Sequence, residues 1–148
     1  MTTIAASVKH GVMVSDSKVT YSNNFYTTRK IFTIKRGLLG TAGDIQLTSP
    51  FEVAILAGQL PVRPAEADKE ASFDGLLLTH DGIVVFDEYY NEIPIYESFA
   101  AIGSGASVAL SWLINGATPQ EAIERACEVD DASGLPVQVE MLTKRTKK

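Results

Sequence analysis

The sequence contains a single cysteine, Cys127, and only two histidines, His10 and His80, among its 148 residues. One cysteine cannot form an internal disulfide, so the chain fits a reducing compartment. Two histidines and one cysteine far apart in sequence do not give the spacing of a metal-binding motif. A Ser-His-Asp triad built on either histidine is disfavoured for the same reason. These absences exclude a disulfide scaffold and direct attention to other chemistry.

Long apolar runs are also missing, and none approaches the roughly 20 residues of a membrane-spanning helix. Without a basic-then-apolar leader, we expect a soluble, cytoplasmic protein with no membrane partner. The net charge of −5 argues against nucleic acid as the main partner, because phosphate binding requires a basic surface. The only basic cluster is the tail, residues 143–148, which we interpret as solvated and poorly ordered, with a docking role as the alternative.

What is present is an ordinary globular composition, with 45% apolar and 21% charged residues, and a length typical of one domain. Alternating apolar and polar residues predict strands separated by turns. The predicted hairpins pair residues 4–8 with 12–14, 31–34 with 38–42, and 75–79 with 83–86; further strands are expected at 98–102 and 135–139. Asp81-Gly82 favours a tight turn in the third hairpin.

Helical patterns interrupt these strands. A short, almost wholly apolar helix is expected to open at Ser49-Pro50, and a second helix covers 106–113. A third runs from 119 to about 129 behind a capping box, with Thr118 as the cap and Glu121 three residues later. Residues 63–72 are polar and indicate a loop or an exposed helical turn. Strand-rich blocks with helices between them predict an α+β fold in which two packed sheets carry helices outside.

Thr2 is a candidate nucleophile. Methionine before a small residue is commonly removed after synthesis, which would leave Thr2 first, with a free α-amine beside its hydroxyl. A hydroxyl is a weak nucleophile until a base takes its proton, and an α-amine with a pKa of about 7.7–8.0 can accept it. Many chains begin Met-Thr-Thr without a catalytic role, so Thr2 is informative only together with the rest of the sequence.

Four further segments carry polar side chains at the ends of predicted elements. They are Asp16 after the second strand, Lys30 at the start of a later strand, Gly103-Ser104-Gly105, and Asp130-Asp131-Ala132-Ser133-Gly134. Each has a structural interpretation, since aspartate favours turns, lysine is commonly a surface charge, and serine commonly caps helices. The glycines at 103 and 105 do not make a nucleotide-binding loop, because neither a third glycine nor a lysine follows at the required spacing.

Together with Thr2, these segments resemble the proteasome β-subunit family of N-terminal nucleophile hydrolases, with bacterial HslV-type threonine peptidases the most similar members. They occur in the family's order over most of the chain, and the ordered set is more specific than any one segment. The resemblance implies a four-layer αββα sandwich over residues 1–148. It also implies a threonine-type endopeptidase, without cofactor or metal, that forms an acyl-enzyme on Thr2.

The resemblance also assigns roles to individual residues. The implied catalytic residues are Thr2 as nucleophile, Asp16, Lys30, Ser104, Asp130 and Ser133, and the implied substrate-binding residues are Thr20, Thr41, Gly43 and Ile45. A lysine beside the nucleophile places positive charge where an alkoxide develops, and Asp16 would hold Lys30 in place. The Gly43 amide would stabilise the oxyanion, while Thr41 and Ile45 would line the pocket for the side chain before the cut.

The same resemblance implies a homo-oligomeric ring or double ring that degrades unfolded polypeptides. Nothing in the sequence encodes ATP binding, so we expect any ATP-dependent unfoldase to be a separate polypeptide. The stretch from Gly43 to Phe73 departs from the family, because it is too short for the usual pair of long helices. Two alternatives remain: a non-catalytic ring or scaffold subunit, and an N-terminal nucleophile amidase that acts on small amides.

Overall fold

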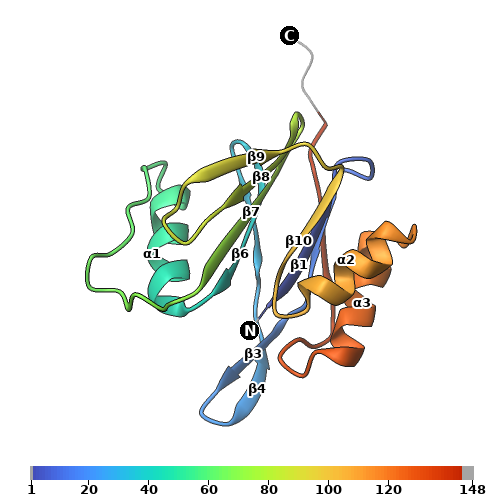
Figure 1. Cartoon of the computed structure of the whole chain (residues 1–148), viewed down its shortest axis with the longest axis horizontal. Coiled ribbons are helices and arrows are strands. Elements are labelled where there is room, and N and C mark those ends of the chain that lie inside the picture. The colour runs from blue at the N-terminus through green and yellow to red at the C-terminus, as the bar shows by residue number, and fades with distance from the viewer. Residues whose placement is uncertain (1, 145–148) are drawn as a thin grey trace.

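A computed structural model describes residues 2–144 of the chain. Met1 and residues 145–148, which belong to the basic tail (143–148) interpreted from the sequence as solvated and poorly ordered, lie outside this range. The described residues form four layers: helix α1, a five-stranded sheet, a four-stranded sheet, and helices α2 and α3 (Figure 1). The predicted α+β sandwich is therefore confirmed. None of the helices in residues 2–144 combines the length and apolarity needed to cross a membrane.

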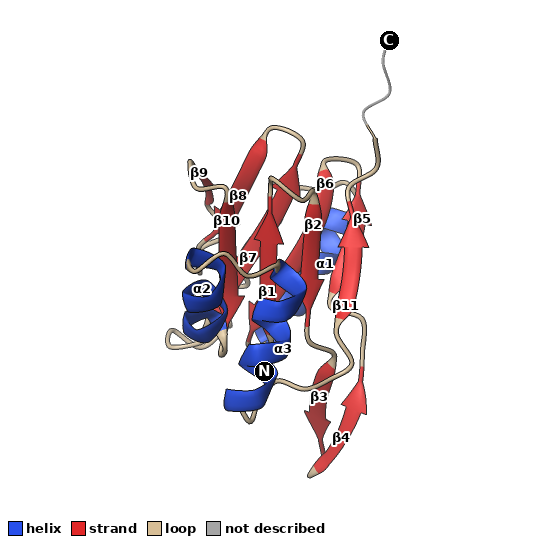
Figure 2. Ribbon diagram, turned by 90° about the vertical axis from the view of Figure 1, so that its right-hand side faces the viewer, coloured by secondary structure: helices blue, strands red, loops and turns tan. Residues whose placement is uncertain are grey.

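The four-stranded sheet has the order β10-β1-β2-β11, with every neighbouring pair antiparallel. Its strands are β1 (Thr3–Ser7), β2 (Val12–Ser15), β10 (Phe99–Gly103) and β11 (Gln138–Met141). β1 is buried along its whole length, because one face packs on the other sheet and the opposite face packs on α2 and α3. Figure 2 shows α2 (Ala106–Ile114) and α3 (Pro119–Val129) in front of this sheet.

The five-stranded sheet is a meander in the order β5-β6-β7-β8-β9. Its strands are β5 (Ile31–Ile34), β6 (Gly37–Gly43), β7 (Phe73–Thr79), β8 (Gly82–Phe86) and β9 (Glu92–Ile95). A separate hairpin of β3 (Lys18–Tyr21) and β4 (Asn24–Thr27) connects β2 to β5 and projects from one end of the molecule (Figure 1).

Three apolar clusters hold the layers together. Ile4, Met13, Leu38 and Leu76 belong to the cluster between the two sheets. A second cluster joins the four-stranded sheet to α2 and α3, and a third joins the five-stranded sheet to α1 (Ile45–Leu56). In the third, the ring of Phe51 lies 4.9–5.0 Å from three other aromatic rings. Such tilted and edge-on contacts stabilise a pair beyond the area that it buries.

The predicted hairpins, α2 and the capping box of α3 are confirmed, whereas the starts of two predicted elements need correction and three strands were not predicted. Helix α1 begins at Ile45 rather than Ser49, because the Asp44 carbonyl accepts the amides of the first helical turn and buried Leu47 and Phe51 anchor one face. The last strand begins at Gln138 rather than Leu135. The β3–β4 hairpin and β9 were not predicted, since their residues are mostly exposed and lack clear apolar alternation.

A single helix covers the outer face of the five-stranded sheet within the described residues. Residues 57–72 follow α1 without another helix, as the short interval between Gly43 and Phe73 led us to expect. The opposite side of the sandwich carries α2 and α3 (Figure 1). The two outer layers are therefore unequal.

Candidate active site

Sheet pairing brings the predicted site residues to one end of the sandwich. In the four-stranded sheet, Thr3 pairs with Gly103 and Ile4 pairs with Ser15. This register places the start of β1 next to the end of β2, where Asp16 follows, and next to the turn between β10 and α2. Lys30 immediately precedes β5, and the segment after α3 also returns to this end. Residues separated by more than 100 positions therefore meet around the beginning of the described chain.

Asp16 and Lys30 form an ion pair, with 2.9 Å between Lys30 Nζ and Asp16 Oδ1. The Asp16 side chain is fully buried, and that of Lys30 is 7% exposed. Three backbone amides also donate to the carboxylate, from Thr3 (3.0 Å), Gly134 (3.1 Å) and Lys18 (3.2 Å). Lys30 Nζ further donates to the carbonyl oxygen of Lys18 at 2.6 Å. A buried ion pair persists only with such additional hydrogen bonds, so this lysine is not an ordinary surface charge.

Burial lowers the pKa of Lys30 from its ordinary value, although the neighbouring Asp16 carboxylate acts in the opposite direction. Desolvation disfavours the ammonium form, whereas a nearby negative charge favours it. Because desolvation prevails, Lys30 gives up a proton more readily than a lysine in water. A lysine in this state is suited to proton transfer as well as to charge stabilisation.

A second polar network runs from β1 to the segment after α3. The Gly105 amide donates to Thr3 Oγ1 at 2.9 Å, and Thr3 Oγ1 lies 2.7 Å from Ser133 Oγ. Ser133 and Ser104 each donate to Oδ2 of Asp130, at 2.6 and 2.5 Å. Since a carboxylate only accepts, the Ser133 proton points to Asp130, and Thr3 therefore donates to Ser133. In this series of hydrogen bonds, each hydroxyl donates toward the Asp130 carboxylate.

Asp130 carries the negative charge of this network. Burial alone raises the pKa of this carboxyl, but hydrogen bonds from Ser104, Ser133 and the amide of Ala132 outweigh it and leave the pKa below its ordinary value. Asp130 is therefore ionised at neutral pH. Asp130 therefore supplies a negative charge near the start of β1, whereas the charge of Asp16 is paired with the Lys30 ammonium.

Thr2 is held at its backbone by the turn between β10 and α2. The amide of Ser104 donates to the carbonyl oxygen of Thr2 at 2.9 Å. Gly103 has φ = +96°, and a Cβ at this position would lie 1.7 Å from the same oxygen. Only glycine allows this approach, so Gly103 has a defined part in positioning Thr2.

Thr2 and Lys30 line one cavity of about 340 Å³. Of the predicted substrate-binding residues, Thr41, Gly43 and Ile45 line it as well, whereas Thr20 is exposed on β3 and is not part of the lining. The other lining residues are Lys18, Val19, Thr28, Arg29, Ala42, Thr48, Ser49 and Glu52. The structure thus brings the predicted nucleophile, the lysine and most of the predicted pocket to one place. Ser104, Asp130 and Ser133 do not line this cavity; they are joined by hydrogen bonds to one another and to Thr2 and Thr3.

The sequence analysis missed two residues of this region, Thr3 in the hydrogen-bond networks and Glu52 in the cavity wall. Thr3 was read only as the neighbour of Thr2, yet its amide and hydroxyl connect the Asp16 and Asp130 networks. Glu52 was not noticed at all, although Ile45, Thr48, Ser49 and Glu52 follow an i, i+3, i+4, i+7 spacing. That spacing places four side chains on one face of a helix, so the pattern of α1 could have identified this wall.

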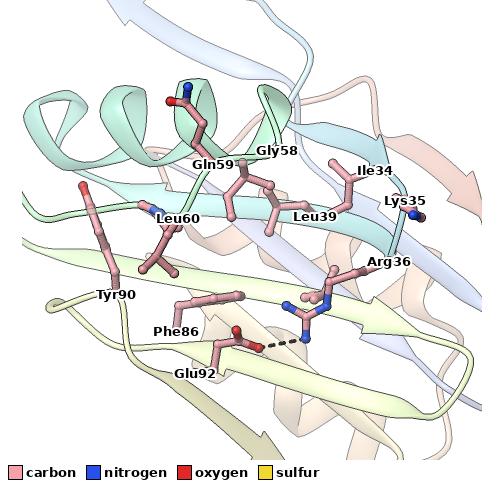
Figure 3. Close-up of a pocket in the computed structure, with 13 residues that line it drawn as sticks. Ile34, Lys35, Arg36, Leu39, Gly58, Gln59, Leu60, Phe86, Tyr90 and Glu92 are labelled. Carbon is pink, nitrogen blue, oxygen red and sulfur yellow. Dashed lines mark hydrogen bonds and ion pairs between the residues drawn. The ribbon is translucent and has the colours of Figure 1, made fainter.

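Another cavity, of about 330 Å³, lies between the end of α1 and the five-stranded sheet (Figure 3). Its floor is mainly apolar, with Leu39, Leu60 and Phe86 among its lining residues. Its ion pair, Arg36–Glu92 at 2.8 Å, is about half exposed on both sides. No predicted site residue lines this cavity, so its chemistry differs from that of the cavity at Thr2.

No group of metal-ligating side chains suited to an ion occurs in residues 2–144.

The layers of the sandwich match those of solved proteasome-like proteins. BPH of Thiobacillus denitrificans in complex with epoxomicin superposes with a TM-score of 0.71 at 18% identity, covering 96% of this chain and 100% of that chain. BPH solved alone gives 0.68 at 17% identity, covering 97% and 99%. Eukaryotic HslV from Trypanosoma brucei gives 0.66 at 20% identity, covering 93% and 97%.

The chain has the HslV fold. The resemblance stated from the sequence is confirmed at this level, as is the four-layer sandwich. No protein-family model and no curated protein matches the sequence. Because the likeness is one of fold at 17–20% identity, any assignment of activity depends on the geometry around Thr2.

Proposed function

We propose that the chain is a threonine-type endopeptidase of the HslV kind, with Thr2 as its nucleophile once Thr2 is the first residue. The observation that carries this proposal is that Thr2 and Lys30 line one cavity, with the Lys30 ammonium held by the buried carboxylate of Asp16. An N-terminal hydroxyl next to its own amine, with a lysine of lowered pKa close by, is an arrangement suited to nucleophilic attack.

In the proposed reaction, Thr2 Oγ1 attacks a peptide carbonyl while its proton passes to the α-amine. The Lys30 ammonium stabilises negative charge on the attacking oxygen, and the Gly43 amide stabilises the oxyanion. Collapse of the tetrahedral intermediate breaks the C–N bond, and the leaving amine takes the proton. An ester remains on Thr2, and water then hydrolyses it with the α-amine again acting as base.

The Asp130 network would place the α-amine. Ser104 fixes the carbonyl of Thr2 through its amide, and its hydroxyl binds an ionised Asp130. The charge of Asp130 and the hydroxyls of Ser104 and Ser133 supply acceptors for an ammonium at this end of β1. We assign these three residues to positioning the amine and Lys30 to the reacting oxygen.

We further propose that copies of the chain assemble into a homo-oligomeric ring that encloses the cavities. Apolar side chains on and after α1 are largely exposed in a single copy, with Val53 at 66%, Leu56 at 54% and Leu60 at 86%. Exposed apolar surface of this kind favours burial against another chain. An enclosed chamber would admit unfolded polypeptides, and a separate ATP-dependent unfoldase would supply them. A cytoplasmic location fits this proposal.

The test compares three proteins with unfolded polypeptide and short fluorogenic peptides as substrates. A removable N-terminal fusion is cleaved to leave Thr2 first, and a matched form keeps one glycine before Thr2. The third protein carries Thr2→Ala. We expect cleavage by the first form only, with a loss of at least about 10⁴-fold in the other two, since a nucleophile and its base act as a unit. Equal rates in all three forms would contradict the proposal.

The two alternatives predict different outcomes of the same test. A ring or scaffold subunit would form an oligomer but cleave nothing, even with Thr2 exposed. An amidase would hydrolyse small amides and leave peptides intact. Sedimentation of the processed protein completes the comparison, because a strictly monomeric species contradicts the enclosed chamber.

A further inference from the structure

Glu52 places a carboxylate in the wall of the cavity that holds Thr2. Ile45, Thr48, Ser49 and Glu52 form one face of α1, and all four line this cavity. Glu52 is seven residues beyond Ile45, which corresponds to about 10 Å along the helix axis. The carboxylate itself reaches the last residues of β6, since Thr41 donates a hydrogen bond to it and Gly43, two residues later, lines the same cavity.

The Glu52 carboxylate has little compensation for its burial. Its side chain is half-buried, and Thr41 Oγ1 donates a hydrogen bond to its Oε1 atom. Within residues 2–144 it takes part in no ion pair. Burial raises the pKa of Glu52, and the Thr41 hydrogen bond offsets this only in part. A carboxylate in this state gains free energy from any cation that reaches it.

The lysines that line the same cavity are engaged elsewhere. Lys30 Nζ is bound by the carboxylate of Asp16 and by a backbone carbonyl. Lys18 Nζ donates to the carbonyl of Asp131 at 2.5 Å and lies 4.1 Å from the centre of the Phe25 ring. The third cation of the lining, Arg29, is exposed. The wall near Glu52 therefore carries an anion that its neighbours do not neutralise.

We propose that Glu52 makes the cavity selective for a cationic side chain, lysine or arginine, at the residue before the scissile bond. This assignment rests on the proposed peptidase function, which puts the cleaved carbonyl at Thr2. Small residues, namely Ala42, Gly43 and Ser49, line the cavity together with Thr2 and Glu52, which favours a long, slender side chain as its occupant. A lysine stem with a terminal ammonium, or a guanidinium that binds a carboxylate with two hydrogen bonds, matches this shape and charge.

Neutral and acidic side chains fit less well. An apolar side chain would displace water from Glu52 and leave its carboxylate without a partner. An acidic side chain would add a like charge. A site built around a polar group rejects ligands that lack the complementary group more strongly than an apolar pocket rejects a misfit. The expected order is therefore lysine or arginine first, then neutral residues, then glutamate.

The first experiment measures kcat/KM on peptides that differ only before the cut, with lysine, its neutral analogue norleucine, or glutamate. The processed protein is expected to favour lysine over norleucine by about tenfold or more. In Glu52→Gln this ratio should fall to about 1. Glu128→Gln, which removes a surface carboxylate of α3, is the matched control and should keep the ratio. Preference for norleucine by the unmodified protein, or an unchanged ratio in Glu52→Gln, would overturn the assignment.

A binding measurement separates this assignment from the peptidase proposal. Calorimetry with Thr2→Ala protein and the same peptides needs no catalysis, and tighter binding of the lysine peptide that Glu52→Gln abolishes supports the selectivity. If such binding occurs but no form cleaves peptides, the peptidase proposal fails and the cation site remains. If the processed protein cleaves the peptides but prefers lysine neither in kcat/KM nor in binding, the peptidase proposal stands and the cation site is refuted.

Discussion

Two of the cavities have nearly the same volume, about 340 and 330 Å³, and each is lined by a cation that belongs to an ion pair, Lys30 in one and Arg36 in the other. At the Arg36 cavity the pair is about half exposed on both sides, whereas at the Thr2 cavity Asp16 is fully buried and Lys30 is 7% exposed. Three backbone amides also converge on Asp16. These two cavities therefore differ in the burial of their charged residues and not in volume, and buried charges are the feature that is more typical of functional sites.

The largest expected effect comes from removing the cation at each cavity. Lys30→Ala should reduce peptide cleavage by about 10²–10⁴-fold, because the charge opposite the reacting oxygen is lost. Arg36→Ala, at the other cavity, should leave the rate within about twofold, since an exposed ion pair contributes little. Steady-state kinetics on both variants provide the measurement, and circular dichroism checks that each one folds. Similar cleavage rates in the two variants would mean that Lys30 is no more important for activity than Arg36.

Removing the anions tests the same contrast in stability. Asp16→Ala leaves the Lys30 ammonium buried without its partner and frees three backbone amides, so the free energy of unfolding should fall by about 3–5 kcal/mol. Glu92→Ala should lower it by less than about 1 kcal/mol. Urea denaturation of both variants measures the difference. Equal losses of unfolding free energy in the two variants would mean that Asp16 contributes no more to stability than an exposed carboxylate.

A smaller effect is expected from the backbone around Thr2. Gly103→Ala should lower the free energy of unfolding by about 1–3 kcal/mol, because φ is positive and the new methyl group meets the Thr2 carbonyl. Gly116→Ala is the matched control, with φ = +91° and nothing within 4 Å of the added methyl. It should carry only the strain of about 1 kcal/mol. Thermal unfolding and activity together report whether Gly103 positions Thr2, since only Gly103→Ala should also slow cleavage.

The smallest effect is expected at Cys127, which is near the buried pair but outside the proposed reaction. Burial raises the pKa of this thiol to about 11. Its labelling by a maleimide should therefore be slow at pH 7 and rise about tenfold per pH unit toward pH 10, following the thiolate fraction. The neutral thiol stabilises the fold fully below pH 9, and this contribution declines as pH rises through 9 to 11. Fast labelling at pH 7, or inhibition by it, would place Cys127 in the site.

The sequence predicted the parts of the fold where local chemistry and tertiary packing agree. The β1–β2 hairpin alternates clearly, and α3 carries both halves of a capping box, so each was identified correctly. The start of α1 was missed because Pro50 was read as a first helical residue, whereas the burial of Leu47 extends the helix backwards. The β3–β4 hairpin is largely exposed and so lacks the apolar pattern on which such predictions depend.

The candidate site shows the same division. Thr2, Asp16 and Lys30 were found because their order along the chain resembles a known family, and not because local spacing reveals that they meet. Thr3 was missed since a small polar residue in a buried strand gives no sign of its hydrogen bonds, which join it to Ser133, 130 positions away. Glu52 was missed because the sequence analysis started α1 at Ser49, which hid the face that Glu52 shares with Ile45 and Thr48. That Glu52 has no ion pair within residues 2–144 is visible only in the structure.

The most direct test of the central claim is the intact mass of the processed protein after treatment with a peptide epoxyketone, a reagent that adds to a hydroxyl and a free amine together. The account predicts one adduct per chain, located on Thr2 by peptide mapping and absent from Thr2→Ala and from the form with a glycine before Thr2. No adduct on the processed protein, or the same adduct on Thr2→Ala, would contradict it.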